Sequence, residues 1–336
     1  MRIITWGDAR HVNTSHRCFE PAHALKERGH EVLVLRDGDG ARTDVLPPSC
    51  DVLLVHRLHS ANVQRTAQTL TAAGSAFVWD NDDDLTDVPP NPRGSVKRGG
   101  LRSQLTASEL SAAIGLADLV TTPSSDLAER FRAGGAQAVT VVENYVPDAF
   151  SHVKRPQHDG VTIGWVAGYE HIYDLRELRL RDSLRRLLDT REDVRVVSIG
   201  LDLSLERDRY RYMPMVHYAD LPRLTAEWDV GIAPLADVSF NRARSNCKLK
   251  EYSAVGTPWL ASPVGPYLGL GEREGGLLVA DDEWDEALQR LVDSPRERAK
   301  LGKRGRKWAR NHAMSRNVKR WEAALSEAVE RRRSRR

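Results

Sequence analysis

Charged residues with helical spacing are the clearest sign of chemistry in this sequence. Lys248 and Glu251 are three positions apart, so they share one face of a helix. Arg244 and Lys248 flank the point where that helix is expected to begin. A helix N-terminus attracts phosphate through its backbone N–H groups, and flanking cations add to that attraction. We therefore predict a diphosphate site here; the alternative is a surface ion pair between Lys248 and Glu251.

The elements around these residues form a β-α-β unit. Residues 230–235 and 259–261 are short apolar runs typical of buried parallel strands. Gly256 ends the helix between them, and Pro258 prevents it from resuming. The loop before the helix therefore lies at the carboxyl end of the sheet, where open α/β folds bind ligands.

The segment Glu-Tyr-Ser-Ala-Val-Gly-Thr-Pro, residues 251–258, resembles the nucleotide-sugar-binding helix of GT-B glycosyltransferases of the retaining family GT4. There, a glutamate is followed by Gly five residues later and by Pro seven residues later, as at Glu251, Gly256 and Pro258. The resemblance implies that Glu251 binds the nucleotide ribose and that Arg244 and Lys248 stabilise the leaving diphosphate.

The chain departs from that family pattern at one position. Many GT4 enzymes carry two glutamates separated by seven residues, and Ala243 occupies the position of the first. The segment Ser-Asn-Cys-Lys that follows is similar to a GT4 variant, which makes Asn246 a donor-binding candidate. The departure leaves the sugar-contacting role of the first glutamate unassigned.

Three further loops are implied to contact the donor. Gly168 follows the first strand of the second half and lets a backbone N–H approach an anion. His171 would donate to phosphate, or would only begin a helix. Tyr218, at the end of a short third strand predicted over 216–218, would stack on the base or pack in the core. Gly265 would offer a backbone N–H to the sugar or phosphate.

The opening strand, polar loop and helix also resemble the start of a GT-B N-terminal domain, whose first loop faces the interdomain cleft. Asn13, His16 and Arg17 are therefore acceptor-binding candidates. Alternatively, His16 and Arg17 lie in solvent in the first helical turn. The loop has no GxGxxG, so the dinucleotide fingerprint is missing here.

Four carboxylates occur in the five residues from Asp80 to Asp84, directly after an apolar strand. They repel one another, so water, cations or a partner must hold them. They could bind a divalent metal, contact acceptor hydroxyls or act as a base, or lie in a solvated loop. Some GT4 relatives have a similar segment, so we expect Asp80 and Asp83 to contact the acceptor, with no metal. The loop Val88–Gly100 is expected to lie close to the cleft.

Composition places limits on the class of protein. The chain has 336 residues, is 40% hydrophobic and 29% charged, and carries a net charge of +3. These values fit a soluble globular protein of two domains and argue against a nucleic-acid binder by charge alone. Cys18, Cys50 and Cys247 form no CxxC pair, and no apolar run is long enough to span a membrane, so we expect a cytoplasmic protein. The C-terminal run 330–336 is a solvated basic tail or a weak contact with anionic lipid.

Strands alternating with helices predict an α/β protein of the GT-B type, with two Rossmann-like, doubly wound parallel sheets. We place an acceptor-binding domain at 1–150 and a nucleotide-sugar-binding domain at 151–336, joined by a polar linker over 147–160. The resemblance implies that the final helix crosses back onto the first domain. We expect Trp308 or Trp321 to anchor it there.

The resemblance implies a hexosyltransferase-type glycosyltransferase that moves a sugar from a nucleoside-diphosphate sugar to an acceptor hydroxyl with retention, without metal or other cofactor. The acceptor would be a carbohydrate, a lipid-linked molecule or a small molecule, and no nucleic-acid partner is expected. A non-catalytic nucleotide-sugar-binding subunit, encouraged by Ala243, is one alternative. Another GT-B enzyme, an epimerase or a phosphorylase, is the other.

Overall fold

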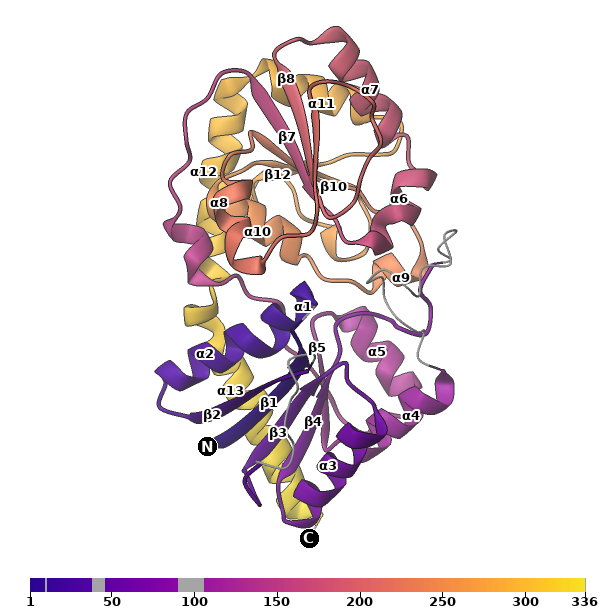
Figure 1. Ribbon diagram of the computed structural model, residues 1–336, viewed down its shortest axis with the longest axis vertical. Coiled ribbons are helices and arrows are strands. Elements are labelled where there is room, and N and C mark those ends of the chain that lie inside the picture. Colours follow the sequence, from indigo (N-terminus) through magenta and orange to yellow (C-terminus); the bar gives the residue numbers. More distant parts are fainter. Residues whose placement is uncertain (10, 38–45, 90–105, 336) are drawn as a thin grey trace.

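The computed structural model describes residues 1–9, 11–37, 46–89 and 106–335. Within these residues the chain forms two six-stranded sheets in which all strand pairs are parallel. Figure 1 shows the two sheets one above the other, each flanked by helices. The predicted fold, an α/β protein with two doubly wound parallel sheets, is confirmed.

The first sheet has the strand order β2-β1-β3-β4-β5-β6. Its strands are β1 (Arg2–Asp8), β2 (Glu31–Asp37), β3 (Val52–His56), β4 (Ala76–Asp80), β5 (Leu119–Thr122) and β6 (Val139–Val141). Its helices are α1 (Val12–Thr14), a π-helical turn (Ser15–Phe19), α2 (Glu20–Glu27), α3 (Ala61–Ala72), α4 (Ala107–Leu116) and α5 (Ser125–Ala133). Both β3 and β4 are buried along their whole length, because helices cover both faces of a parallel sheet.

The second sheet has the strand order β12-β11-β10-β7-β8-β9. Its strands are β7 (Val161–Val166), β8 (Val194–Ile199), β9 (Tyr210–Met213), β10 (Val230–Ala233), β11 (Trp259–Ala261) and β12 (Gly276–Leu278). Its helices are α6 (Ile172–Glu177), α7 (Leu180–Thr190), α8 (Leu221–Thr225), α9 (Ser239–Arg242), α10 (Cys247–Val255), α11 (Trp284–Asp293) and α12 (Pro295–Asn311). Among the described residues there are also the 3₁₀ turns η3 (Asp148–His152), η4 (Tyr169–His171), η5 (Tyr218–Asp220) and η6 (Gly265–Tyr267).

The strand order reverses once in each sheet. In the first sheet the reversal lies between β1 and β3, and in the second it lies between β7 and β10. Loops leave such a point on opposite faces of the sheet, so a crevice opens at the carboxyl ends of the two strands. The loops after β7 and β10 carry Gly168, His171 and Arg244, and the loop after β1 leads to His16. The topology therefore places the candidate residues at these two crevices.

The final helix, α13 (Met314–Ser334), crosses back onto the first sheet, as predicted. Its apolar face, which includes Val318, Trp321 and Leu325, packs in one core with residues of β1, β3 and β4. Trp321 is fully buried and anchors the helix, whereas Trp308 belongs to α12 and packs in the core of the second domain. Of the two tryptophans proposed as anchors, Trp321 has that role.

One predicted strand is wrong. Residues 216–218 form no strand; the third strand of the second domain is β9, and Tyr218 begins the 3₁₀ turn η5. The segment of β9, Tyr-Arg-Tyr-Met, is a half-exposed edge strand and therefore needs no continuous apolar run. The prediction placed this strand at 216–218, a few residues after β9.

The helix α10 begins and ends as its sequence predicts. Asn246 is its N-cap residue, and Gly256 follows its last turn in the left-handed conformation, with a φ of 78°. A residue with a Cβ is strained at that φ, which is why glycine stands at this end. Across the described residues, no helix is long and apolar enough to cross a membrane.

Candidate active site

Three residues from the two loops at the second crevice meet beside the N-terminus of α10. Arg244 lies just before this helix, Lys248 lies in its first turn, and His171 ends η4. The His171 Nε2 atom lies 3.2 Å from Arg244 Nη1 and 3.5 Å from Lys248 Nζ. The structure therefore brings His171 beside Arg244 and Lys248, from which it is 73 and 77 positions away in the sequence. All three residues were proposed to contact the donor phosphates.

A buried carboxylate fixes the orientation of His171. Asp174 Oδ2 lies 2.6 Å from His171 Nδ1, and Asp174 Oδ1 accepts from the Ala236 backbone N–H and from Asn241 Nδ2. We infer from this network that His171 Nδ1–H donates to Asp174, which leaves the Nε2 lone pair facing the two cations. Burial, together with the positive charges of Arg244 and Lys248, lowers the pKa of His171 to about 4.

The protonation of His171 changes the role expected for it. At neutral pH its Nε2 atom accepts from Arg244 or Lys248, so it has no proton to give to a phosphate oxygen at that atom. The expected donation from His171 to phosphate does not fit this arrangement. His171 instead holds the cations that would contact the phosphate.

Glu170 is a site residue that the sequence analysis did not single out. Its Oε1 atom accepts from Arg244 Nη2 at 3.2 Å. Burial raises the pKa of Glu170, but the Arg244 cation and His171 more than offset this, and the resulting pKa is about 2. Its position between Gly168 and His171 was visible in the sequence, but its neighbour Arg244, which gives it a role, is 74 residues away.

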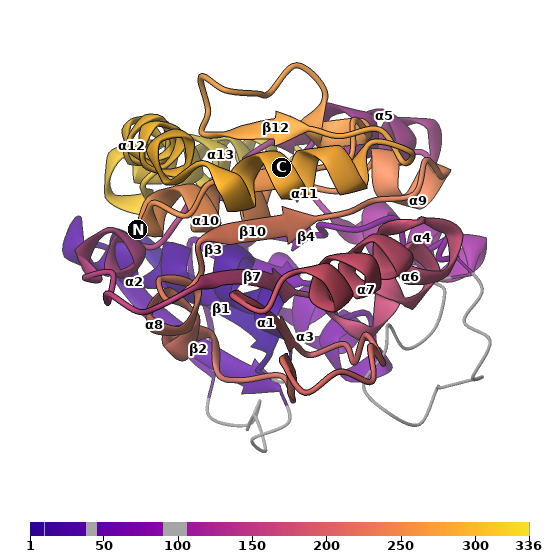
Figure 2. The same cartoon turned by 90° about the horizontal axis from the view of Figure 1, so that it is seen from above.

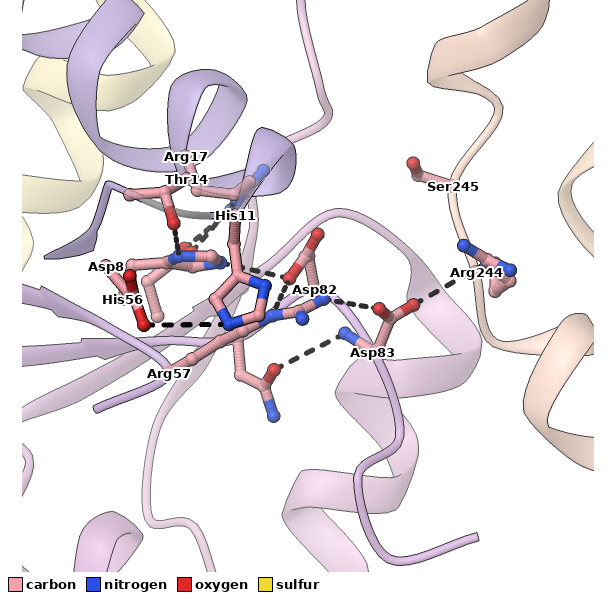
Figure 3. Close-up of polar contacts among 12 residues, drawn as sticks. Asp8, His11, Thr14, Arg17, His56, Arg57, Asp82, Asp83, Arg244 and Ser245 are labelled. Carbon is pink, nitrogen blue, oxygen red and sulfur yellow. Dashed lines mark hydrogen bonds and ion pairs between the residues drawn. The ribbon is translucent and has the colours of Figure 1, made fainter. Parts of the chain in front are cut away.

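The first domain contributes a second carboxylate to Arg244. Asp83 Oδ1 lies 3.6 Å from Arg244 Nε, and the other Asp83 oxygen accepts from Arg57. Figure 3 shows Asp83 between these two arginines, one from each domain. Burial lowers the pKa of Arg244, but the negative charges of Asp83 and Glu170 outweigh this and raise it. Asp83 thus links Arg57 of the first domain to Arg244 of the second.

Lys248 is the less neutralised of the two cations. No carboxylate of the described residues lies within ion-pair distance of its Nζ, whereas Arg244 has two. Burial and the nearby Arg244 lower the pKa of Lys248. A half-buried cation without a carboxylate partner is costly, so the site favours an added anion at this point.

A second group of three residues joins the domains beside Lys248. Glu251 Oε1 accepts from the Tyr218 hydroxyl at 2.8 Å and lies 3.1 Å from His16 Nε2. The rings of His16 and Tyr218 meet edge to face, with centroids 4.8 Å apart. Burial, and then the Glu251 charge, raise the pKa of Tyr218 well above its usual value. Glu251 therefore pairs across the interface and not with Lys248, which rules out the surface ion pair considered above.

Arg17 and Asp80 form a pair inside the first domain. Arg17 donates two hydrogen bonds to Asp80, of 3.0 and 2.7 Å, and a third to Asn144 Oδ1 at 2.9 Å. Both side chains are fully buried, and Arg17 also lies over the Trp321 ring, 4.8 Å from its centroid. This placement argues against the acceptor contacts proposed for Arg17 and Asp80, because their polar atoms are saturated within the protein.

The remaining carboxylates of the acidic run also have basic partners. Asp82 accepts from His56 and Arg57, at 3.0 and 2.6 Å, and Asp84 accepts from Arg130 at 2.6 Å. Burial raises the pKa of Asp82, but Arg57 and His56 hold it well below its usual range. Protein cations thus neutralise the run, and the described residues contain no group of three or more His, Cys, Asp or Glu that could hold a metal ion.

Other predicted residues lie around this centre without a shown contact to it. Asn13 is half-buried in α1, and the Asn246 side chain makes no capping hydrogen bond. A Cβ on Gly168 would lie 2.2 Å from a Glu170 carboxylate oxygen, so a larger residue there would displace that side chain. Gly265 has a φ of 52° and lines a cavity of about 380 Å³ between α5 and the loop after β11. In the predicted loop Val88–Gly100, residues 90–100 lie outside the described residues.

A larger cavity lies away from these residues. It has a volume of about 720 Å³ and is lined by residues of β8, β9 and α8, among them Val197, Met213 and Trp228. None of the predicted site residues lines it. It lies against β8 and β9 at the edge of the sheet, and its lining residues include none of Arg244, Lys248 and His171.

Comparisons with known proteins agree with the fold. Residues 176–323 match a family model described as glycosyl transferase-like. No curated protein matches the chain.

Solved structures of low sequence identity share the whole architecture. HepE of Anabaena in complex with UDP-glucose is 15% identical, with a TM-score of 0.64 over 99% of this chain and 100% of that one. An α-glucosyltransferase in complex with UDP is 11% identical, with a TM-score of 0.68 over 97% and 100%. A putative UDP-N-acetylglucosamine 2-epimerase from Listeria monocytogenes is 13% identical, with a TM-score of 0.59 over 98% and 97%. The chain therefore has the GT-B fold, and its second domain is similar to the glycosyl transferase-like family.

Proposed function

We propose that this protein is a glycosyltransferase that transfers a sugar from a uridine-diphosphate sugar to an acceptor hydroxyl, with retention of configuration. The observation that carries the proposal is the convergence of Arg244 and Lys248 on His171 beside the N-terminus of α10. The similarity of residues 176–323 to glycosyl transferases, and the UDP or UDP-glucose named for two structural neighbours, support the choice of reaction and of nucleotide.

When the donor binds, its diphosphate would replace protein groups that contact Arg244 and would add an anionic partner for Lys248. The diphosphate is a dianion that competes with Glu170 and Asp83 for Arg244 and gives Lys248 the anion it lacks. Backbone N–H groups at the start of α10 add to the attraction. Glu251, held by Tyr218 and His16, would accept from the ribose hydroxyls.

In the transfer step, the acceptor oxygen attacks the anomeric carbon from the face that the diphosphate leaves. The bond from that carbon to the diphosphate oxygen breaks, the bond to the acceptor oxygen forms, and the hydroxyl proton passes to the leaving diphosphate. Arg244 and Lys248 stabilise the charge that develops on the diphosphate, which is a larger effect in a site from which water is excluded. We propose that this chemistry needs no metal.

The acceptor side is the less defined half of the proposal. Asp83 and Asn13 remain our candidates for acceptor contact, and the acceptor is a carbohydrate, a lipid-linked molecule or a small molecule. Asp83 would be released from Arg244 when the donor binds, which makes its carboxylate available to an acceptor hydroxyl. Two further predictions are that the transferred sugar is a hexose and that the protein acts in the cytoplasm.

The first test is thermal unfolding of the protein with UDP, GDP, dTDP and ADP, each with and without magnesium. A ligand that binds only the folded state raises the melting temperature by mass action. We expect UDP to give the largest shift and magnesium to be unnecessary. The shift should be lost in Lys248→Ala and retained in Lys26→Ala, a matched change at an exposed lysine of α2.

Each other outcome of this test has a definite meaning. No shift with any nucleotide would contradict the donor site. A shift that occurs only with magnesium would contradict metal independence. Binding of UDP-sugar without turnover across a panel of acceptors would favour a non-catalytic nucleotide-sugar-binding subunit.

The similarity to a putative epimerase supports a second candidate, a UDP-sugar epimerase. The two reactions differ in their products. A transferase consumes UDP-sugar in proportion to acceptor and releases UDP, whereas an epimerase changes the sugar without needing an acceptor. Product analysis by NMR separates them directly.

A further inference from the structure

A row of basic residues runs along the exposed face of α12. Its members, which we call the α12 stripe, are Arg296, Lys300, Lys303, Lys307 and Arg310. Their spacing of four, three, four and three residues places all five on one face of the helix, over a length of about 21 Å. All five are exposed. Within the described part of the chain, only Lys300 has a carboxylate within ion-pair distance, Glu272 at 3.9 Å.

The opposite face of α12 is fixed against the donor-site helix. Leu301, Gly302, Gly305 and Ala309 are buried. A Cβ on Gly302 would lie 2.3 Å from the Gly256 carbonyl oxygen, so α12 and α10 approach as closely as only glycine permits. The α12 stripe therefore cannot turn inward and is held rigidly on the outer edge of the second domain, where Figure 1 and Figure 2 both show α12.

The charge of the whole chain is strongly segregated. Residues 295–336 contain 16 lysines and arginines against four acidic residues, so they carry +12, and the first 294 residues carry −9 to give the total of +3. The basic end is not a free tail, because α13 continues to Ser334 and both Arg332 and Arg335 pair with Asp118. The C-terminal run is therefore helical and partly paired, although most of its described side chains are exposed, and a second exposed basic row lies on α12.

We propose that the α12 stripe docks the protein on an anionic lipid surface. A straight row of point charges on a convex helix fits a plane of negative headgroups, to which each basic residue adds attraction. Repulsion of the acidic remainder would orient the molecule with α12 toward the bilayer. A nucleic acid fits less well, because the row has no exposed aromatic residue for base stacking, and Trp308 is half-buried in the core. This inference does not depend on the proposed reaction.

The test is flotation of the full chain with vesicles of phosphatidylcholine, alone or with about a third of phosphatidylglycerol. We expect binding only to the anionic vesicles, and weaker binding as salt increases. The triple variant Lys303→Gln, Lys307→Gln, Arg310→Gln should lose about 100-fold in partitioning, because each basic residue near such a surface contributes about fivefold. The matched control is Arg65→Gln, Arg195→Gln, Arg211→Gln, which removes the same charge from exposed positions in α3, β8 and β9; it should bind as the unaltered protein does.

Three results would overturn the inference. The first is absence of binding to anionic vesicles at low salt. The second is an equal loss in the control variant, which would indicate net charge and not the stripe. The third is tighter binding to a DNA or RNA duplex with the same dependence on the three residues, which would make nucleic acid the partner. Unfolding curves of both variants check that any loss is not caused by misfolding.

Discussion

Two charged clusters lie at the carboxyl ends of the two sheets, and their contacts differ. In the acidic run after β4, Arg17 holds Asp80 by hydrogen bonds of 2.7 and 3.0 Å, and Arg130 holds Asp84 at 2.6 Å. In the cationic cluster before α10, the contacts of Arg244 with polar side chains are 3.2 to 3.6 Å long, and the contact of Lys248 with His171 is 3.5 Å long. Apart from Asp83, which also contacts Arg244, the carboxylates of the first cluster are saturated, whereas the cations of the second are not.

This difference distinguishes charges that stabilise the fold from charges that can bind a ligand. Short, multiple hydrogen bonds between buried groups leave no capacity for a ligand, and removing one partner leaves an unpaired buried charge. Longer contacts to groups that a diphosphate can replace leave the cations free to bind it. A charged run that looks functional in the sequence can therefore be part of the scaffold.

The largest expected effect is on the saturated cluster. Asp80→Ala leaves Arg17 buried without its carboxylate and should lower the free energy of unfolding by about 3–5 kcal/mol. Denaturant unfolding measures this value. The control is Asp87→Ala, at an exposed position seven residues later, which should change it by less than about 0.5 kcal/mol. Equal effects in the two variants would remove the distinction between the clusters.

Substitution in the unsaturated cluster should act on binding. Arg244→Ala should raise the Kd for UDP about 10- to 100-fold, because it removes a charged hydrogen-bond donor to the diphosphate. Arg242→Ala is the matched control, since Arg242 is exposed and pairs with Asp237. Isothermal titration calorimetry measures both. Unchanged affinity in Arg244→Ala would place the diphosphate elsewhere.

The low pKa of His171 predicts a loss of stability on acidification. The folded state holds this group neutral down to about pH 4, whereas the unfolded chain takes up the proton near pH 6.5. The unfolded state therefore binds more protons, and stability should fall by about 2 kcal/mol between about pH 6.5 and pH 5. Glu170, with its pKa of about 2, contributes to acid sensitivity only below about pH 4.5.

Comparing variants isolates this contribution. His171→Gln should lose less stability over that pH interval than the unaltered protein, as measured by denaturant unfolding at each pH. His23→Gln, at an exposed position in α2, should keep the full dependence. An unchanged slope in His171→Gln would assign the acid sensitivity to another group.

The smallest expected effect concerns the competing carboxylate. Glu170→Gln removes a negative charge that occupies Arg244, so UDP should bind about fivefold more tightly, which corresponds to about 1 kcal/mol. Glu177→Gln, an exposed glutamate at the end of α6, is the control. Calorimetry again provides the affinity. Weaker binding in Glu170→Gln would show that Glu170 contacts the ligand and does not compete with it.

Much of the fold could be predicted because its signals are local. Apolar runs, together with glycine and proline at the ends of helices, located most strands and the boundaries of α10. The prediction failed at β9, a half-exposed strand without a continuous apolar run, as its place at the edge of the sheet allows. An edge position is a property of the assembled sheet, and no local pattern reports it.

For the candidate site, the sequence indicated the cations and the class of ligand expected for them, but not their partners within the protein. Glu170 and Asp174 were visible as polar residues beside His171, yet nothing local showed that one holds Arg244 and the other orients the imidazole. The roles proposed for Arg17 and Asp80 changed for the same reason, since these residues lie 63 positions apart and meet only in the folded sheet.

The sequence by itself determined the alternation of strands and helices, the start and end of α10, and the placement of Arg244 and Lys248 at its N-terminus. Each of these features depends on residues that are close together in the sequence, within a few turns of a helix. The tertiary structure decided which charges are neutralised and which stay available, because that depends on which loops meet where the strand order reverses. Ion pairs between distant segments leave no periodic pattern in the sequence. Only the packed sheets bring the paired residues within hydrogen-bonding distance.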